Sequence, residues 1–264
     1  MKIATYNVNG IRAALGKGLL EWVQAGDYDV VCLQEVKANE DQVDLSGFAD
    51  LDYHWAWRGA EKKGYSGVAT FWKADLASAL AAEVSHPVEV PLPLEGRILR
   101  TDFSASDTLP AYSLLNIYFP SGSSGDERQA VKMDFLHALG AYLAQVRAQQ
   151  PNLIVVGDYN IAHTPLDIHN PKSNKNSSGF LPDERAWMSG FLAGGMVDAF
   201  RALHPDAQEY SWWSFRGGAR ANNKGWRIDY QMVSEPLRPY LKTAFHLPDD
   251  KHSDHCALVV EYGG

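Results

Sequence analysis

Short runs of hydrophobic residues, each about as long as a β-strand, recur along the whole chain. Several are rich in β-branched or aromatic residues and are bounded by Gly, Asp or Pro, which favours strands over helices. The predicted strands are Ile3–Val8, Val30–Leu33, Tyr53–Trp57, Gly67–Trp72, Ile98–Phe103, Tyr112–Phe119, Leu153–Val156, Ile228–Val233 and Ala257–Tyr262. The run Tyr112–Phe119 alternates poorly, so we expect that strand to be covered on both faces.

Helical periodicity is clearest after Ser124, where hydrophobic residues recur every three to four positions. This stripe consists of Val131, Phe135, Leu139, Tyr142, Leu143 and Val146. Ser124 and Glu127 have the spacing of a capping box, and Pro151 ends the predicted helix. Further helices are predicted over Leu19–Gln24 and from Pro182 onward. Because strands outnumber helices and the two are interspersed, we predict an α/β sandwich with sheets inside and helices outside.

Length and composition fit one globular unit. The 264 residues are 45% hydrophobic, and no linker or internal repeat marks a boundary, so we expect a single domain over residues 1–264 and a monomer. The chain begins without a signal-peptide pattern, and no hydrophobic run is long enough to span a bilayer. The two cysteines, Cys32 and Cys256, lie in or beside hydrophobic runs. We therefore expect reduced core thiols in a cytoplasmic protein that makes no membrane contact.

The formal net charge of −8 by itself argues against nucleic-acid binding, because non-specific affinity for DNA comes from Lys and Arg side chains on phosphates. Carboxylates that bind a metal would contribute to this acidity, while a local basic rim can still face DNA. Whole-chain charge bears on solubility and steering more than on the chemistry of a site.

Polar side chains that can bind a metal or transfer a proton lie next to several of the predicted strands. They are Asn7, Asn9, Glu35, Tyr118, Asp158, Asn160, Asp229, Asp254 and His255. In layered α/β folds, functional sites are built at strand ends. Taken singly, an Asp or Asn here is more often a turn or capping residue, and Tyr118 or His255 a structural one. The joint pattern is what indicates a site.

This set suits hydrolysis of a phosphodiester, which requires charge neutralisation on the phosphoryl oxygens, an activated water and help for the leaving oxygen. Mg²⁺ prefers hard oxygen ligands and needs only one or two carboxylates. We predict Glu35 as the first ligand, with Asn7 and Asp254 nearby. No P-loop, HExxH zinc motif, GxSxG elbow or CxxC pair supports another chemistry.

The remaining residues have complementary predicted roles. His255 paired with Asp229 would hold one imidazole tautomer and bind or polarise the phosphate. Asp158 would orient or deprotonate the attacking water. Asn160 would fix Asp158 and donate to a phosphate oxygen, and Tyr118 would donate a hydrogen bond to the developing charge.

Nine segments match one known family. They are TYNVNGIR (5–12), DVVCLQEVK (29–37), GYSGVA (64–69), EGR (95–97), NIYFPSG (116–122), VVGDYNIAH (155–163), NSSGFLPDER (176–185), GWRIDYQMVS (225–234) and SDH (253–255). Together they span nearly the whole chain in the expected order. The chain therefore resembles the exonuclease III / AP endonuclease family, within the wider endonuclease/exonuclease/phosphatase superfamily.

The resemblance implies a four-layered α/β sandwich, in which two packed mixed β-sheets are flanked by helices. It implies Mg²⁺ or Mn²⁺, cleavage of double-stranded DNA 5′ to an abasic site, and removal of 3′ nucleotides or blocking groups. No obligate protein partner is implied. Tyr118, Asp158, Asn160, Asp229 and His255 fall on the family's catalytic positions. The candidate metal ligands are Asn7, Glu35, Asp158, Asn160, Asp254 and His255.

The resemblance also implies DNA contacts from loops around the site. Tyr65 would enter a groove or pack on the backbone, while phosphate contacts are implied for Lys62, Arg97, Asn174 and Lys175. Trp212 and Trp226 would form the walls of a pocket for an extruded abasic sugar, which has no base to unstack. Plainer alternatives are core packing, with at least one of Trp212 and Trp213 buried, and a solvated charge pair at Lys62 and Lys63.

Three positions depart from the family pattern. Asn9 stands where some animal members have Asp, the residues around Ser124 offer no Arg where some members place one over the abasic site, and Ser177 replaces an Asn found in some relatives. These departures leave the balance between AP endonuclease and 3′-end activity open. Two other hypotheses also remain: a superfamily member acting on inositol phosphates or sphingomyelin, and a non-catalytic regulator. The GYSGVA and GWRIDYQMVS loops favour DNA over the first, and the intact catalytic set argues against the second.

Overall fold

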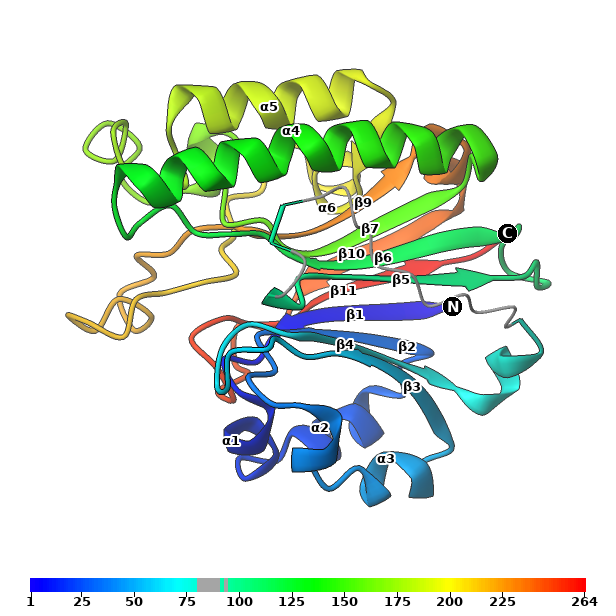
Figure 1. The fold of residues 1–264 in the computed structure, drawn as a ribbon. Helices are drawn as coiled ribbons and strands as arrows, with labels where there is room; N and C mark the ends of the chain where they lie inside the picture. The colour runs from blue at the N-terminus through cyan, green and yellow to red at the C-terminus, as the bar shows by residue number, and fades with distance from the viewer. Residues whose placement is uncertain (80–90, 93–94) are drawn as a thin grey trace.

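The computed structural model of the chain describes residues 1–79, 91–92 and 95–264. In these residues, a six-stranded and a five-stranded sheet pack face to face, and helices cover their outer faces (Figure 1). Both sheets are mixed, because β1 pairs parallel with β2 and β6 parallel with β7, while their other pairs are antiparallel. The predicted four-layered α/β sandwich is confirmed.

The strand order places the segments that carry the candidate residues near the middle of each sheet. The six-stranded sheet runs β10 (Leu241–His246), β11 (Leu258–Tyr262), β1 (Lys2–Asn7), β2 (Val30–Gln34), β4 (Val68–Lys73), β3 (Tyr53–Arg58). The five-stranded sheet runs β5 (Ile98–Phe103), β6 (Tyr112–Tyr118), β7 (Leu153–Asp158), β9 (Asp229–Ser234), β8 (Met196–Asp198). The strand β6 is buried on both faces, as its poor alternation predicts.

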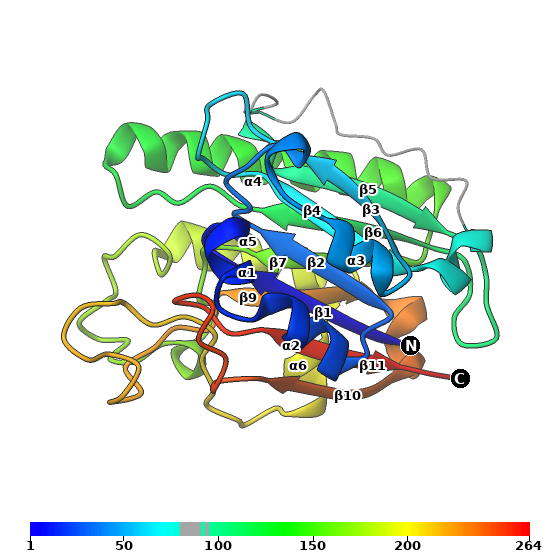
Figure 2. The same cartoon turned by 90° about the horizontal axis from the view of Figure 1, so that it is seen from below.

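The helices divide between the two outer faces. The six-stranded sheet is covered by α1 (Ile11–Leu15), α2 (Leu19–Gly26) and α3 (Ser46–Asp50), which lie nearest the viewer in Figure 2. The five-stranded sheet is covered by α4 (Asp126–Gln149) and α5 (Pro182–Ala193), and α6 (Ala199–Leu203) packs on β9 and β10. Short 3₁₀ helices are η1 (Glu40–Gln42), η2 (Ala74–Ala79), η4 (Pro165–Asp167) and η5 (Glu235–Tyr240).

Three buried layers hold the sandwich together, and they follow from the alternation of side chains along each strand. Ile3 of β1 and Leu114 of β6 point into the core between the sheets. The next residue of β1, Ala4, faces the opposite way and packs with Phe48 under the first group of helices. The predicted stripe of α4, represented by Phe135, packs on the outer face of the five-stranded sheet.

The structure corrects two details of the sequence-based prediction. The N-cap of α4 is Gly125, which has φ 117° and no capping side chain, so the predicted Ser124–Glu127 capping box is wrong. Glycine reaches this backbone angle without the steric cost that Ser would meet. The strands β8 and β10 were not predicted, because β8 has three residues and β10 is an edge strand in which half of the side chains are exposed. No helix in the described residues is long and apolar enough to cross a membrane.

Strand register brings candidate residues to one end of the sandwich, at the left of Figure 1. In the five-stranded sheet, Tyr118 pairs with Asp158 across β6 and β7, and Asp158 pairs with Asp229 across β7 and β9. Gln34, the residue before Glu35, reaches across from the other sheet and donates from Nε2 to Asn116 Oδ1 at 2.7 Å. This buried bond fixes one sheet against the other directly below the site.

Candidate active site

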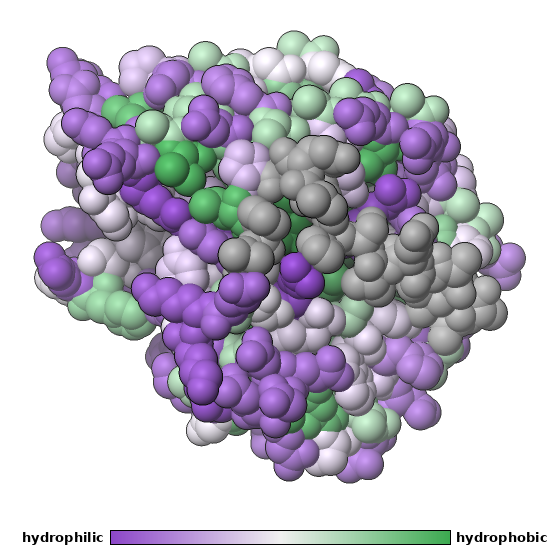
Figure 3. Space-filling view, in the orientation of Figure 1, coloured by the Kyte–Doolittle hydropathy of each residue, from purple (hydrophilic) through white to green (hydrophobic). Residues whose placement is uncertain are grey.

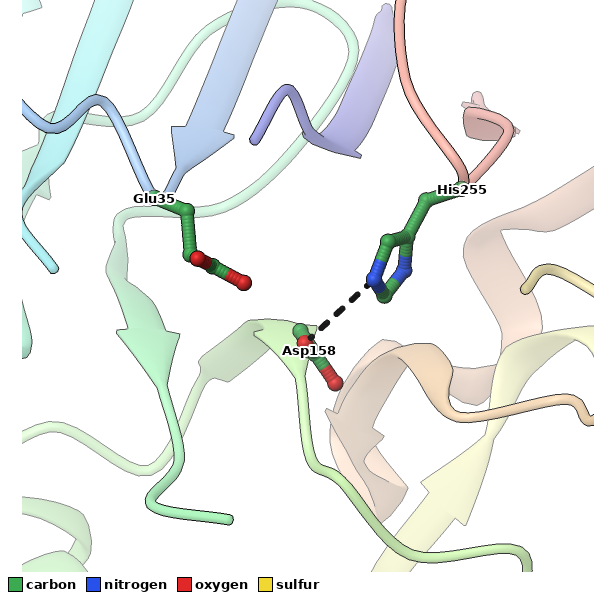
Figure 4. Close-up of side chains that lie close together, drawn as sticks. All are labelled: Glu35, Asp158 and His255. Atoms are coloured by element: carbon green, nitrogen blue, oxygen red, sulfur yellow. Dashed lines mark ion pairs between the residues drawn. The ribbon is translucent and has the colours of Figure 1, made fainter. Parts of the chain in front are cut away.

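Glu35, Asp158 and His255 converge from three segments that lie far apart in the sequence (Figure 4). Glu35 follows β2, Asp158 ends β7, and His255 precedes β11. One ligand atom from each side chain lies within 4.8 Å of the others. They border a cavity of about 280 Å³ lined by Glu35, Tyr118, Ser121, Ser123, Asp158, Asn160, Ser178, Gly179, Trp212, Trp226, Ile228, Asp254 and His255. Hydrophilic residues predominate over the loops at this end of the molecule (Figure 3).

The imidazole of His255 lies between two buried carboxylates. Its Nδ1 is 2.8 Å from Asp229 Oδ2, and its Nε2 is 3.8 Å from Asp158 Oδ2. All three residues are at most 4% exposed. The predicted His–Asp pair is therefore present, and it is packed against the third carboxylate rather than isolated from it.

Burial and charge act on these groups in opposite directions. Burial raises the pKa of Asp158 to about 7; His255 opposes this increase, while Asp229 and Glu35 add to it. Burial alone would lower the pKa of His255, but Asp229 and Asp158 raise it to about 10. The imidazole is therefore protonated at neutral pH, because it is the cation that two buried carboxylates share.

Two asparagines hold the carboxylates in place. Asn7 donates from Nδ2 to Glu35 Oε1 and to Asp158 Oδ2, both at 2.9 Å. Asn160 donates its backbone N–H to Asp158 Oδ1 at 2.8 Å, and its side chain donates to the Phe119 carbonyl at 3.0 Å. Glu35 and Asn160 have positive φ angles of 50° and 53°. Such backbone strain in non-glycine residues is concentrated at functional sites.

Lys37 belongs to the site, although the sequence analysis did not single it out. Its ammonium lies 3.0 Å from Glu35 Oε2 and also donates to Asn9 Oδ1. Burial disfavours ionisation of Glu35, but Lys37 and Asn7 hold its pKa below the ordinary value. The sequence did contain a signal for Lys37: it is a cation two residues after the candidate ligand Glu35, within the segment DVVCLQEVK.

Asp254 connects this acidic end of the cavity to one of its aromatic walls. Its Oδ1 accepts a hydrogen bond from Asn9 Nδ2 and its Oδ2 one from Trp212 Nε1, both at 2.9 Å. The rings of Trp212 and Trp226 meet edge to face with centroids 6.1 Å apart. Trp213 is 4% exposed, which confirms that at least one of the adjacent tryptophans is buried.

Tyr118 is held by a cluster of charged and aromatic side chains. The cluster includes Arg128, a second residue that the sequence analysis did not predict. Arg97 lies over the Tyr118 ring at 4.6 Å and donates to the Tyr118 carbonyl at 3.0 Å. Arg97 and Arg128 both donate to Glu95 and to the hydroxyl of Tyr65. The pKa of Tyr118 lies well above its ordinary value, because burial and the neighbouring carboxylates Glu35 and Asp158 disfavour a phenolate. Tyr118 is therefore a hydrogen-bond donor.

Of the remaining candidates for DNA contact, two are exposed lysines and two have side chains that are already hydrogen-bonded within the protein. Lys62 and Lys175 are exposed, and the Lys62 ammonium lies 5.1 Å from the centre of the Tyr65 ring. Asn174 donates its side-chain amide to the carbonyls of its own loop. Arg97 is only 4% exposed, and its guanidinium is engaged by its neighbours. The phosphate contact predicted for Arg97 stays a prediction that this packing disfavours.

The donor atoms suit a hard divalent cation. Glu35 and Asp158 present carboxylate oxygens, which Mg²⁺ and Mn²⁺ prefer, and the ammonium of Lys37 already lies against one of them. Asn7 directs its amide nitrogen at both carboxylates, while its oxygen accepts the N–H of Asn9 at 3.0 Å. With both ring nitrogens facing carboxylates, His255 fits a hydrogen-bond donor better than a metal ligand.

A second hollow of about 330 Å³ lies between α4 and α5. Its lining is mostly hydrophobic, including Trp187 and Phe191, and Arg147 is its one charged residue. It contains no pair of groups that can exchange a proton or bind a metal. Of these two cavities, the acidic one is therefore the one that can carry out chemistry, although it is the smaller.

Comparisons with known proteins agree with this geometry. The sequence profile described as Endonuclease/Exonuclease/phosphatase family matches residues 4–255. An exodeoxyribonuclease of Bacillus subtilis is 39% identical over 263 residues, covering 98% of each chain. The DNA repair nuclease APEX1 of Danio rerio is 36% identical over 270 residues, covering 98% of this chain and 81% of its own. The crystal structure of the AP endonuclease LMAP from Leishmania major superposes with a TM-score of 0.88 at 32% identity, covering 100% of this chain and 87% of that one.

Proposed function

Because the chain belongs to the endonuclease/exonuclease/phosphatase family, and within it to the exonuclease III / AP endonuclease group, we propose that it is a divalent-metal-dependent DNA-repair nuclease. Its reaction is hydrolysis of DNA phosphodiester bonds, 5′ to abasic sites and at 3′ ends. The observation that carries this proposal is the meeting of Glu35, Asp158 and His255 beside a cavity with two tryptophan walls. The cavity provides the acid–base groups and a space for a sugar together.

Glu35 and Asp158 would hold the metal, which we infer to be Mg²⁺ or Mn²⁺ from their hard oxygen donors. When bound, such an ion supplies Lewis-acid neutralisation of phosphoryl charge. Asn7 keeps the two carboxylates at a fixed spacing because it donates to both. Asp254 does not contact these carboxylates directly. It is connected to the metal end through Asn9, whose side chain donates to Asp254 Oδ1 at 2.9 Å.

The other residues supply proton transfer and charge stabilisation. The raised pKa of Asp158 suits a base that orients or deprotonates an attacking water near neutral pH. The imidazolium of His255, kept protonated by Asp229, donates to a phosphoryl oxygen. Tyr118 donates a hydrogen bond from its phenolic hydroxyl to the charge that develops in the transition state, and Asn160 fixes Asp158.

DNA recognition rests on the loops around the cavity. Trp212 and Trp226, whose rings meet edge to face, form a wall of the cavity against which the extruded abasic sugar packs. Lys62, Lys175 and Tyr65 contact the backbone, which supplies the local basic surface that a chain of net charge −8 needs for DNA. We further propose a single domain acting as a monomer, and the two unpaired, buried cysteines favour the reducing cytoplasm as its location.

The test uses two labelled duplexes, one with a single abasic-site analogue and one intact with a recessed 3′ end. Each is incubated with Mg²⁺ and with EDTA. A Mg²⁺-dependent nick 5′ to the lesion supports AP endonuclease activity, and shortening without the nick restricts the function to 3′ ends. Failure to cut either duplex, together with turnover of inositol phosphates, would refute the proposal in favour of a phosphatase acting outside DNA.

A further inference from the structure

Lys132 and Glu184 form a fully buried ion pair behind the active-site cavity. Lys132 lies on α4 and Glu184 in the first turn of α5, and both side chains are 0% exposed. Their Nζ and Oε1 atoms are 2.5 Å apart. Burial lowers the pKa of Lys132, while the charge of Glu184 opposes this effect. The hydrophobic stripe of α4 gives no reason for a lysine at this position.

The ammonium of Lys132 also reaches the active site. It donates to the backbone carbonyl of Asn160 at 2.9 Å. Asn160 in turn donates its N–H to Asp158 Oδ1 at 2.8 Å. A single cation therefore binds α4 directly to the backbone that orients the candidate base.

Glu184 extends the same connection to the loop that borders the cavity. Its Oε2 accepts the N–H of Gly179 at 2.7 Å and that of Leu181 at 2.9 Å. Gly179 packs so closely that a Cβ there would lie 2.9 Å from the Trp226 ring and 3.0 Å from the Asn160 carbonyl. The pair thus braces the Asn160 backbone and the loop under Trp226 against each other.

Stability alone does not explain such a pair. Removing two charges from water is costly, and replacement of a buried ion pair by hydrophobic residues is often neutral or stabilising. A buried pair is better explained where it fixes one arrangement of the backbone. Here its hydrogen bonds end on the two segments that line the cavity.

We propose that Lys132, through its pair with Glu184, is a positioning residue that sets the place of Asn160 and of the Ser178–Gly179 segment relative to Asp158 and Trp226. It touches no substrate. The inference rests on the proposed nuclease function for its catalytic consequence, but the positioning itself can be measured without DNA.

The experiment uses the double variant Lys132→Met with Glu184→Gln, which removes both charges and leaves no unpaired ion in the core. The control is Leu139→Ala, which truncates a buried residue on the same helix away from the cavity and is expected to lower stability. Both are compared with the unaltered protein at a temperature where unfolding curves show all three to be folded. Amide hydrogen exchange at Ala162, Gly179 and Leu181 reports on the braced segments.

We expect faster exchange at these amides in the double variant and not in Leu139→Ala. On the abasic duplex, kcat should fall about 10- to 100-fold, as expected for a small displacement of catalytic groups, while the Kd for DNA in EDTA changes less than about threefold. Unchanged exchange, or a kcat within about twofold of Leu139→Ala, overturns the proposal. If the unaltered protein cuts no DNA, the proposed function fails, and hydrogen exchange alone then decides the positioning role.

Discussion

Asp158 and Asp229 lie directly opposite each other on the antiparallel strands β7 and β9. Two carboxylates in this register would repel each other in a buried site, because like charges at close range oppose ionisation. His255 relieves the repulsion, with Nδ1 2.8 Å from Asp229 and Nε2 3.8 Å from Asp158. The register of one strand pair therefore sets both the charge of the imidazole and the basicity of Asp158.

Replacing Asp229 by Asn should disable His255 without removing it. The amide carries no charge to hold the imidazole protonated, so the pKa of His255 should fall from its raised value. We expect kcat on an abasic duplex to drop by at least about 100-fold, since loss of the orienting Asp in a His–Asp pair can cost about 10⁴-fold. Steady-state kinetics measure this, with the exposed residue Asp206→Asn as the control. A variant that keeps kcat within threefold of the control would contradict the assignment.

Replacing Asp158 by Asn tests the predicted base itself. The amide cannot accept a proton, so kcat should fall by at least about 100-fold, as is typical for loss of a general base. DNA affinity measured by fluorescence anisotropy in EDTA should change little, because the loss falls on the transition state rather than on ground-state binding. If activity survives within a few fold, or if it falls only in proportion to affinity, Asp158 is not the base.

A divalent ion should stabilise the folded protein through Glu35. Addition of Mg²⁺ or Mn²⁺ should raise Tm, because a ligand at 100 times its Kd contributes about 2.7 kcal/mol to the folded state. EDTA should reverse the rise, and Glu35→Gln should remove most of it. Differential scanning calorimetry measures the shift, with Glu40→Gln as the control at an acid outside the cavity. An equal shift in Glu35→Gln and in the control would place the ion elsewhere.

The sequence predicts the parts of this site better than their spatial arrangement. Asp158 and Asp229 were predicted because each is next to a hydrophobic run of strand length, and that pattern is local. Their register depends on how distant segments pair as strands, and the periodicity of hydrophobic residues carries no information about that pairing. The fold and the convergence of site residues were expected from the family resemblance, which carries information that single residues lack.

The residues that were missed have ordinary local patterns. Arg128 is a charged residue in the first turns of a helix, where solvent exposure is the usual outcome. Its hydrogen bonds to Glu95 and Tyr65 arise only because the segment before β5 and the loop between β3 and β4 both lie against the first turn of α4. Lys132 lies between Val131 and Met133 on α4, and its buried charge is paired only because Glu184 approaches from α5. Such pairs follow from the packing of layers.

The ion pair between Asp167 and Arg227 should make the free energy of unfolding depend on pH in the acidic range. Burial opposes ionisation of Asp167, but Arg227 and Arg201 lower its pKa from 3.8 to about 2. A lowered folded-state pKa stabilises the protein above pH 3.8, and this contribution is lost as pH falls toward 2. The shift corresponds to about 2 kcal/mol.

The comparison for Asp167 is with Asp167→Asn, which has no carboxylate to titrate. Urea unfolding at pH 7, 4 and 3 should show a stability difference between the two proteins that narrows as pH falls. Asp206→Asn, at an exposed position, should show a constant small difference from the unaltered protein. A gap for Asp167→Asn that stays constant from pH 7 to pH 3 would mean that the carboxylate is not stabilised by its partners.

Trp226 should matter more for abasic DNA than for 3′ ends. Its ring meets Trp212 edge to face at 6.1 Å, and Trp212 is itself fixed by its 2.9 Å hydrogen bond to Asp254. Under the proposed function, only an internal abasic site needs its sugar to be extruded and packed against these rings, and hydrophobic contacts of this kind discriminate substrates by about 10- to 200-fold. Trp226→Leu should therefore lower kcat/KM for nicking at least about tenfold more than kcat/KM for 3′-end removal, with Trp55→Leu, remote from the cavity, as the control. An equal loss of both activities would mean that Trp226 supports the site as a whole and does not select the lesion.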